Sequence, residues 1–112
     1  MLTDEVRYKL LRLLEEQPGL SQRDVARELD VSLGKVNFCL NALIGRGLVK
    51  ASRFKNSQNK AAYMYLLTPS GIREKARVTA RFLKVKMMEF ETLHAEIEQI
   101  RREAMGREKR RE

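Results

Sequence analysis

The spacing of apolar and polar residues predicts three short helices in the N-terminal part of the chain. The first begins after Thr3, whose side chain can accept a hydrogen bond from a free N–H group at a helix start. Ser21 and Ser32 are the expected caps of the second and third helices, and each follows an apolar residue that can pack against the first turn. Only Asp30 and Val31 separate the last apolar residue of the second helix from the cap of the third. Two short helices joined by so tight a turn indicate a helix-turn-helix.

A β-hairpin is predicted after the third helix. Residues 48–54 and 61–67 have the composition of strands and are separated by a polar turn. In the second strand Tyr63, Tyr65 and Leu67 alternate with other residues, so they share one face, which we expect to point inward. A hairpin in this position would form the wing of a winged helix-turn-helix.

A single long helix is predicted from Pro69 to about Gly106, because only Gly71, in its first turn, interrupts the helical pattern. At 1.5 Å per residue this helix is roughly 55 Å long. Its apolar residues cover more surface than a small domain can bury, which favours a two-fold homodimer over a helix folded back on its own chain. The expected dimer interface consists of Ile72, Ala76, Leu83, Met87, Phe90, Leu93, Ile97 and Ile100.

These elements define the expected organisation of the chain. The fold class is mainly α with a small β-hairpin, a winged helix-turn-helix followed by a long C-terminal dimerisation helix. We expect the winged helix-turn-helix domain in residues 1–68 and the dimerisation helix in residues 69–106. Residues 107–112 are charged and are expected to form a disordered tail.

The distribution of charge adds a functional indication. The net charge is +8, and between Val31 and Arg73 the chain holds seven basic residues and no acidic one, although it has 15 acidic residues in all. A stretch with one sign of charge is typical of a surface that binds a polyanion. Because this stretch includes the third helix and the hairpin, the sequence predicts binding to double-stranded DNA.

The outward face of the third helix carries the candidate base-reading residues. Asn37 and Asn41 lie one turn apart, and asparagine can pair with the edge of adenine in the major groove. Gly34 would let the start of the helix approach the duplex, and Lys35 can contact a guanine or a phosphate. Phe38 either meets thymine methyl groups or packs beneath the wing, and the sequence leaves both interpretations open.

Other candidate residues are suited to the phosphate backbone. Ser21, Gln22 and Ser32 lie at helix N-termini, where free N–H groups favour anions. The expected wing contacts are the cations that flank the polar turn: Arg53, Lys55 and Lys60.

The sequence resembles winged helix-turn-helix regulators of the MarR family. The matching residues are Leu20-Ser21-x-x-Asp24-Val25-Ala26-x-x-Leu29-x-Val31-Ser32-x-x-x-Val36, then Leu43 and Gly47-Leu48-Val49, then Leu67-Thr68-Pro69-x-Gly71. More narrowly, the stretch Lys60-x-x-Tyr63-x-Tyr65-x-Leu67-Thr68-Pro69-Ser70-Gly71 is similar to the short MarR-type regulators associated with exopolysaccharide gene clusters.

The resemblance implies a homodimer that binds a pseudo-palindromic operator and usually represses, with the third helix in the major groove and the wing in the minor groove. The chain differs from full-length members in two respects. It begins almost at the first helix of the DNA-binding module, and it has one long C-terminal helix rather than a pair. Because full-length members often bind small aromatic acids between the two regions, these differences leave the small-molecule effector unknown.

Other features argue against catalysis and against a membrane partner. The sequence has no glycine-rich phosphate loop, no metal-ligand cluster and no catalytic group, so we expect no enzyme, no cofactor and no metal site. No apolar run approaches the length of a membrane span. The single cysteine, Cys39, excludes an intrachain disulfide and fits a cytoplasmic protein. We interpret Cys39 and the lone His94 as packed structural residues.

An alternative function is a protein-interaction or RNA-binding module without an operator of its own, because winged helices are reused in this way. The acid-free third helix and wing favour phosphate contact, which a protein-docking module does not need. Under the alternative, binding should be insensitive to changes at Asn37 and Asn41.

Overall fold

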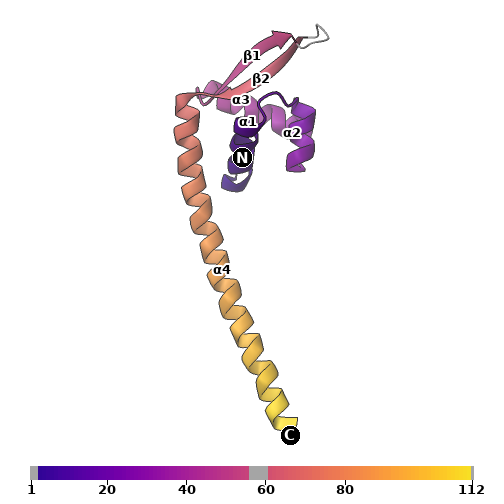
Figure 1. Ribbon diagram of the computed structural model, residues 1–112, viewed down its shortest axis with the longest axis vertical. Coiled ribbons are helices and arrows are strands. Elements are labelled where there is room, and N and C mark those ends of the chain that lie inside the picture. Colours follow the sequence, from indigo (N-terminus) through magenta and orange to yellow (C-terminus); the bar gives the residue numbers. More distant parts are fainter. Residues whose placement is uncertain (1–2, 56–60, 112) are drawn as a thin grey trace. The chain divides into compact units, whose positions relative to one another are not determined.

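The computed structural model describes residues 3–55 and 61–111, and no side chain is described at residues 54, 55, 61, 62 and 107–111. The elements along the chain are α1 (Asp4–Glu16), α2 (Gln22–Leu29), α3 (Leu33–Gly45), β1 (Val49–Lys55), β2 (Ala61–Leu67) and α4 (Pro69–Arg111) (Figure 1). This order confirms the predicted fold class. The chain forms two compact units, Met1–Ala80 and Arg81–Glu112.

Local hydrogen bonds begin the three short helices where the sequence predicts. The Thr3 side chain accepts a hydrogen bond from a backbone N–H of the first turn of α1 at 3.2 Å. Ser21 and Asp24 form a reciprocal capping box, in which the Asp24 N–H donates to the Ser21 hydroxyl at 3.1 Å and the Ser21 N–H donates to the Asp24 carboxylate at 3.4 Å. At α3 the Lys35 N–H donates to the Ser32 hydroxyl at 3.1 Å. Each cap satisfies a donor that a helix start leaves without a partner.

The turn between α2 and α3 depends on the left-handed backbone of Asp30. Its φ of 54° is a conformation that aspartate adopts more readily than most residues. The next N–H, from Val31, donates to the Ala26 carbonyl at 3.0 Å. The turn thus satisfies the last carbonyls of α2 and leads directly into the cap of α3.

The hydrophobic core lies where the three short helices meet the hairpin. The predicted inner face of α3 is confirmed, because Val36, Leu40 and Leu43 are at most 2% exposed. The other core residues are Leu10, Leu11, Leu13, Leu14, Val25, Ala26, Cys39, Leu48, Val49 and Tyr65. Full burial of a leucine contributes about 1.5–3 kcal/mol, so the first unit has a core of its own.

The hairpin extends beyond this core. β1 and β2 pair antiparallel, with Ala51 opposite Tyr65 and Arg53 opposite Tyr63. Tyr65 is 7% exposed and Leu67 packs against the core, which confirms the predicted inward face at these two positions. The prediction was wrong for Tyr63, which is 51% exposed. Tyr63 lies further along the hairpin than the core reaches, and its ring stacks on Tyr65 with 6.4 Å between centroids.

The end of α3 and the start of α4 are joined by close backbone contacts. The Thr68 N–H donates to the Leu48 carbonyl at 3.1 Å, and the Thr68 hydroxyl donates to the Gly47 carbonyl at 2.6 Å. Gly47 has a φ of 72°, which favours glycine. At Gly71 an added Cβ would collide with the Leu48 carbonyl oxygen. Both glycines are therefore required by this junction.

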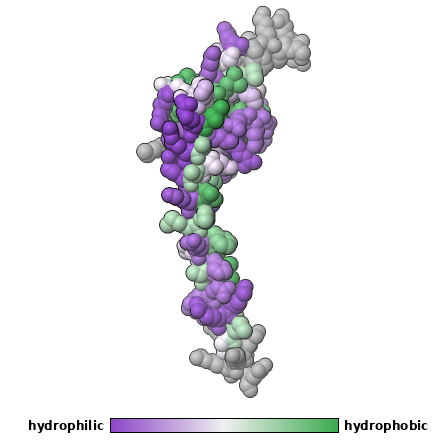
Figure 2. Space-filling model, turned by 60° about the vertical axis from the view of Figure 1, so that its left-hand side comes forward, coloured by the Kyte–Doolittle hydropathy of each residue, from purple (hydrophilic) through white to green (hydrophobic). Residues whose placement is uncertain are grey.

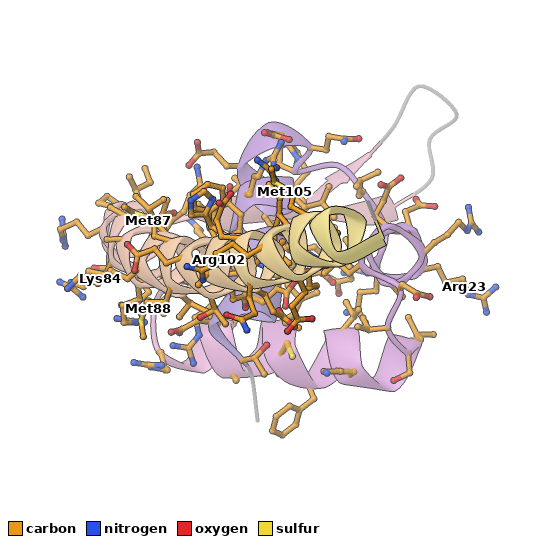
Figure 3. The ribbon with its side chains drawn as sticks, turned by 90° about the horizontal axis from the view of Figure 1, so that it is seen from below. Arg23, Lys84, Met87, Met88, Arg102 and Met105 are labelled. Atoms are coloured by element: carbon orange, nitrogen blue, oxygen red, sulfur yellow. The ribbon has the colours of Figure 1, made fainter. Side chains whose placement is uncertain are left out.

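The second unit is the part of α4 from Arg81 onward, and its apolar side chains are exposed. In the space-filling view they gather on the middle of the helix (Figure 2). Met87 and Met88 project from different sides of the helix (Figure 3) and are 55% and 67% exposed. The helix continues past its expected end at Gly106 to Arg111. The disordered tail expected after Gly106 falls on side chains outside the described part of the chain and stays a prediction.

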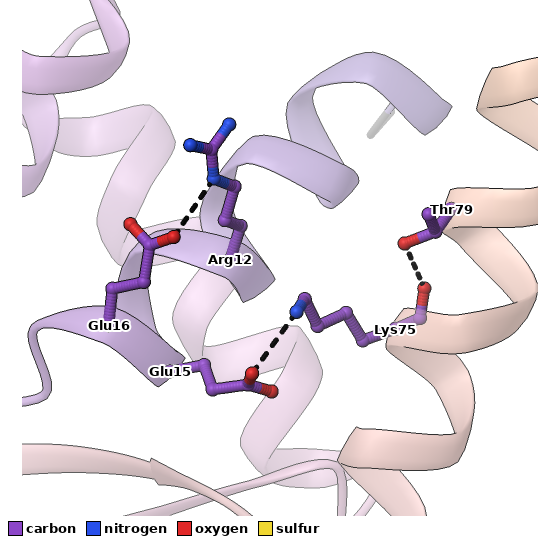
Figure 4. A network of polar contacts seen from close by, with 5 residues as sticks. All are labelled: Arg12, Glu15, Glu16, Lys75 and Thr79. Carbon is purple, nitrogen blue, oxygen red and sulfur yellow. Dashed lines mark hydrogen bonds and ion pairs between the residues drawn. The ribbon is translucent and has the colours of Figure 1, made fainter.

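The first turns of α4 pack within the first unit. Val78 is fully buried and Glu74 is 8% exposed. Arg7 on α1 pairs with Glu74 at 3.8 Å. Lys75 pairs with Glu15, also on α1, at 3.2 Å (Figure 4). Because of these contacts the compact unit extends into α4, beyond the domain boundary that the sequence predicts.

Candidate nucleic-acid interface

The face of α3 opposite the core carries the residues expected to reach DNA bases. Gly34, Lys35, Asn37 and Asn41 are all exposed, and Phe38 is 64% exposed. A B-form major groove admits one α-helix. The exposed face of α3 therefore has the shape and side chains that such an insertion needs.

Phe38 distinguishes between the two interpretations that the sequence leaves open. A phenyl ring that packed beneath the wing would be buried, whereas this ring is 64% exposed. A large apolar side chain on an otherwise polar helix face is typical of a contact surface. The structure therefore supports a contact with a partner, for which thymine methyl groups are suitable.

A chain of hydrogen bonds connects three of the candidate residues. The Asn41 Nδ2 donates to the Asn37 Oδ1 at 3.1 Å, and the Asn37 Nδ2 donates to the Gln22 Oε1 at 3.2 Å. The Gln22 Nε2 in turn donates to the Tyr65 hydroxyl at 2.9 Å. Sequence reasoning identified Gln22, Asn37 and Asn41 separately but missed Tyr65. The only signal for Tyr65 was its inward position on β2, which does not identify a partner.

The two serine caps differ in how well they suit a phosphate. The Ser21 hydroxyl donates to the Asp24 carboxylate at 2.8 Å, so its hydrogen is already used and a negative charge lies beside it. The first turn of α3, after Ser32, contains no acidic residue. Ser32 is therefore better placed than Ser21 for a phosphate contact, because both the helix N-terminus and its charge environment favour an anion.

The structure describes the side chain of one of the three expected wing cations. Arg53 is exposed on β1, and its guanidinium carbon lies 5.7 Å from the centroid of the Tyr63 ring. A cation–π contact of this kind orients a guanidinium while leaving N–H groups able to donate to a phosphate. The side chain of Lys55 and the whole of Lys60 lie outside the described residues.

Cys39 lies in the core, on the inner side of the recognition helix. It is 2% exposed, and burial raises the pKa of its thiol. The thiolate is the reactive form of cysteine. Cys39 is therefore suited to packing rather than to redox chemistry.

The residues of the predicted dimer interface are exposed in the single chain. The large apolar side chains among them are between 43% and 67% exposed: Ile72, Leu83, Met87, Phe90, Leu93, Ile97 and Ile100. Ala76 is exposed as well. Contiguous apolar surface of this kind is typical of a protein–protein interface.

Metal and membrane sites were also considered. Within residues 3–55 and 61–111 no three His, Cys, Asp or Glu side chains gather in a way that could hold a metal ion. In the same part of the chain, no helix combines the length and the apolar composition that crossing a membrane requires.

Comparison with protein families identifies the class of the N-terminal unit. Residues 3–50 match the family described as winged helix-turn-helix DNA-binding. This match covers α1, α2, α3 and the start of β1, the elements that present the exposed face of α3. The chain therefore contains a winged helix-turn-helix DNA-binding domain. No curated protein sequence matches the chain.

Solved structures narrow this class, because the structural neighbours of the chain are MarR-family transcriptional regulators. The zinc-dependent MarR family regulator AdcR is 26% identical over 83% of this chain, with a TM-score of 0.56. The multiple antibiotic-resistance repressor MarR of Listeria monocytogenes is 26% identical over 87% of this chain, with a TM-score of 0.54. The PcaV regulator of Streptomyces coelicolor, solved with its natural ligand, is 24% identical over 73% of this chain, with a TM-score of 0.60.

These similarities confirm the resemblance to the MarR family. The chain spans 60%, 66% and 57% of the lengths of AdcR, the Listeria repressor and PcaV, in that order. The narrower resemblance to regulators associated with exopolysaccharide gene clusters stays a prediction.

Proposed function

We propose that the protein is a sequence-specific DNA-binding transcriptional regulator that acts as a homodimer in the cytoplasm and represses its target genes. The observation that carries this proposal is the exposed face of α3. It displays amide, cationic and aromatic side chains within a stretch of the chain that contains no acidic residue. That combination suits the major groove of DNA, where bases offer both hydrogen-bonding edges and methyl groups to a helix surrounded by phosphates.

In the proposed complex, α3 lies in the major groove and the wing reaches the adjacent minor groove. Asn37 and Asn41 contact bases, Phe38 meets a thymine methyl group, and Lys35 contacts a guanine or a phosphate. Ser21, Gln22 and Ser32 approach the phosphate backbone from the starts of α2 and α3. Arg53, Lys55 and Lys60 supply the cations of the wing. The phosphate contacts fix the register, and the base contacts supply the sequence preference.

Two-fold symmetry determines the form of the operator. The exposed apolar residues of α4, from Ile72 to Ile100, form the proposed interface between two copies. A two-fold dimer presents two copies of α3 in opposite orientations, so it reads a pseudo-palindrome whose half-sites lie one or more helical turns apart. The proposal assigns no small-molecule effector.

A salt-titrated fluorescence anisotropy assay tests the proposal. A duplex selected by the protein from a random library is compared with an unselected duplex of equal length, and light scattering reports the number of copies bound. We expect the selected duplex to bind about 10³-fold more tightly or better at physiological salt. Equal, weak binding to both duplexes that disappears at that salt would contradict operator recognition and favour the interaction-module or RNA-binding alternative.

A further inference from the structure

The hydrogen-bond chain at the candidate interface joins a buried group to the exposed face of α3. It begins at Tyr65 on β2, passes through Gln22 in the first turn of α2, and ends at Asn37 and Asn41 on α3. Its three donor–acceptor distances are 2.9, 3.2 and 3.1 Å, all within the range of ordinary hydrogen bonds. Three separate elements therefore meet at the candidate base-reading residues.

The buried end of the chain is held in place by the fold. Tyr65 is 7% exposed, its ring belongs to the hydrophobic core, and its backbone N–H donates to the Pro18 carbonyl at 3.2 Å. The exposed asparagines have no such packing of their own. An exposed side chain that must adopt one orientation on binding loses conformational entropy, and this cost is smaller when the free protein already holds that orientation. A fixed phenol at one end can therefore order the amides at the other.

The direction of each hydrogen bond determines which groups remain for a base. Gln22 gives an N–H to the phenol, so its carbonyl oxygen accepts from Asn37. Asn37 then uses its own carbonyl oxygen to accept from Asn41. Asn41 keeps its carbonyl oxygen and one N–H, the acceptor and donor that pair with the N6 and N7 edge of adenine. Asn37 has both ends of its amide in the chain.

We propose that Tyr65 is a positioning residue for base recognition, which acts through Gln22 and Asn37 to orient Asn41, the asparagine that reads the base. This inference deepens the proposed function and rests on it. Tyr65 does not touch DNA in this arrangement. Its effect on binding should therefore depend on the DNA sequence and on the presence of Asn37.

The first test replaces Tyr65 with phenylalanine, which keeps the ring and removes the hydroxyl. Anisotropy is measured on the selected duplex and on the unselected duplex. We expect Tyr65→Phe to reduce the ratio of the two affinities about 3- to 10-fold, the range that loss of one neutral hydrogen bond gives, with little change on the unselected duplex. Gln22→Met interrupts the same chain with Tyr65 intact and should reduce the ratio at least as much. Equal losses on both duplexes, or no loss, would overturn the proposal.

A matched control is available within the chain. Tyr8→Phe also removes one tyrosine hydroxyl from the first unit, but Tyr8 lies on α1 beside Arg12 and is not part of the hydrogen-bond chain. Tyr8→Phe should leave the affinity ratio unchanged. Thermal unfolding of both variants shows that each is folded at the temperature of the assay. A ratio that falls equally in both variants would mean that loss of a hydroxyl acts through general destabilisation, against the proposal.

A double-mutant cycle tests whether Tyr65 acts through Asn37. In an Asn37→Ala background, Tyr65→Phe should have no further effect on the affinity ratio, because the path from the phenol to Asn41 is already broken. Additive effects would overturn the relay.

NMR of the DNA-free protein separates failure of this inference from failure of the proposed function. In Tyr65→Phe the side-chain amide signals of Asn37 and Asn41 should shift, whereas in Tyr8→Phe they should not. Wild-type protein that selects no DNA sequence would overturn the proposed function, and the orienting role of Tyr65 would then be decided by these signals alone. Unchanged signals would overturn it, and shifted signals would support it.

Discussion

The two units of the chain treat their apolar side chains in opposite ways. In the first unit, Leu10, Leu40 and Leu43 are at most 1% exposed and belong to one core. In the second unit, Phe90 and Ile100 on α4 are 67% and 59% exposed. The same kind of residue is thus hidden from solvent in one unit and left accessible in the other.

This difference shows where the chain is self-sufficient and where it needs a partner. The first unit folds around its own core, so its polar outer face is available for DNA. The second unit is a helix with little to cover its apolar residues, and burial of such surface against a second copy is the proposed source of dimer stability. On this view, changes in the first unit should alter folding or DNA reading, and changes in the second should alter assembly.

The largest effect is expected from a cavity in the core of the first unit. Leu40 is fully buried on the inner side of α3. Leu40→Ala should lower the free energy of unfolding by about 2–5 kcal/mol, because it removes buried methyl groups and leaves a space. Urea denaturation at fixed protein concentration, followed by circular dichroism, measures this change. The comparison between the units would fail if Leu83→Ala, at a 57% exposed position on α4, destabilised the first unit as much.

A charge on the exposed stripe of α4 should break assembly rather than folding. Phe90→Glu places a carboxylate at the centre of the proposed interface, where burial without a partner is costly. We expect the dimer to weaken by at least about 2 kcal/mol, a typical loss at a central aromatic contact. Sedimentation velocity over a concentration series measures the dissociation constant.

Gln99→Glu supplies the matched control for this charge. It adds the same charge to α4 at an exposed position outside the proposed stripe, so it should leave the dimer intact. A Phe90→Glu protein that sediments as a wild-type dimer would place the interface elsewhere on the chain.

A smaller loss of stability is expected at the junction between α3 and α4. In Gly71→Ala the new methyl group meets the Leu48 carbonyl oxygen, so the backbone must shift. We expect a cost of about 1–3 kcal/mol, as for other overpacked positions. In the control Gly106→Ala nothing lies within 4 Å of the new methyl group, and higher helix propensity should stabilise α4 slightly. Thermal unfolding of the two variants should therefore shift in opposite directions.

Local features of the fold were predictable from sequence, because their causes lie within one or two turns of a helix. The Ser21 capping box joins residues three apart, and the spacing of Val36, Leu40 and Leu43 repeats within α3. The Tyr65–Gln22 hydrogen bond instead joins residues 43 positions apart. No local pattern contains that information.

The same reasoning explains the other differences between prediction and structure. The exposure of Tyr63 depends on how far the core extends beneath the hairpin, which alternation along a strand does not reveal. The collision of a Cβ at Gly71 with Leu48 depends on the packing of two separate elements. Sequence analysis therefore found the exposed face of α3 but not the residue that anchors its hydrogen-bond chain.

Asn41 should affect DNA reading without affecting assembly or folding. It is exposed on α3 and retains an acceptor and a donor at the outer end of the hydrogen-bond chain. Asn41→Ala should weaken binding to the selected duplex by about 1–3 kcal/mol and binding to random duplex much less. Anisotropy titrations at one salt concentration give both values. Equal losses would mean that Asn41 does not contact a base, and the exposed face of α3 would then act only through its charge.

The smallest effect is expected at the wing, and it differs in kind from the effect at Asn41. Arg53 is a cation oriented by the Tyr63 ring, and a phosphate contact by this side chain depends on charge and not on base sequence. Arg53→Ala should weaken binding to selected and random duplexes alike. It should also reduce the slope of log K against log salt by about one unit, because one fewer counterion is released. Arg53→Lys keeps the charge and should largely preserve the slope. A slope that does not change in Arg53→Ala would remove this side chain from the interface, whereas a loss confined to the selected duplex would mean that the wing, like α3, reads sequence.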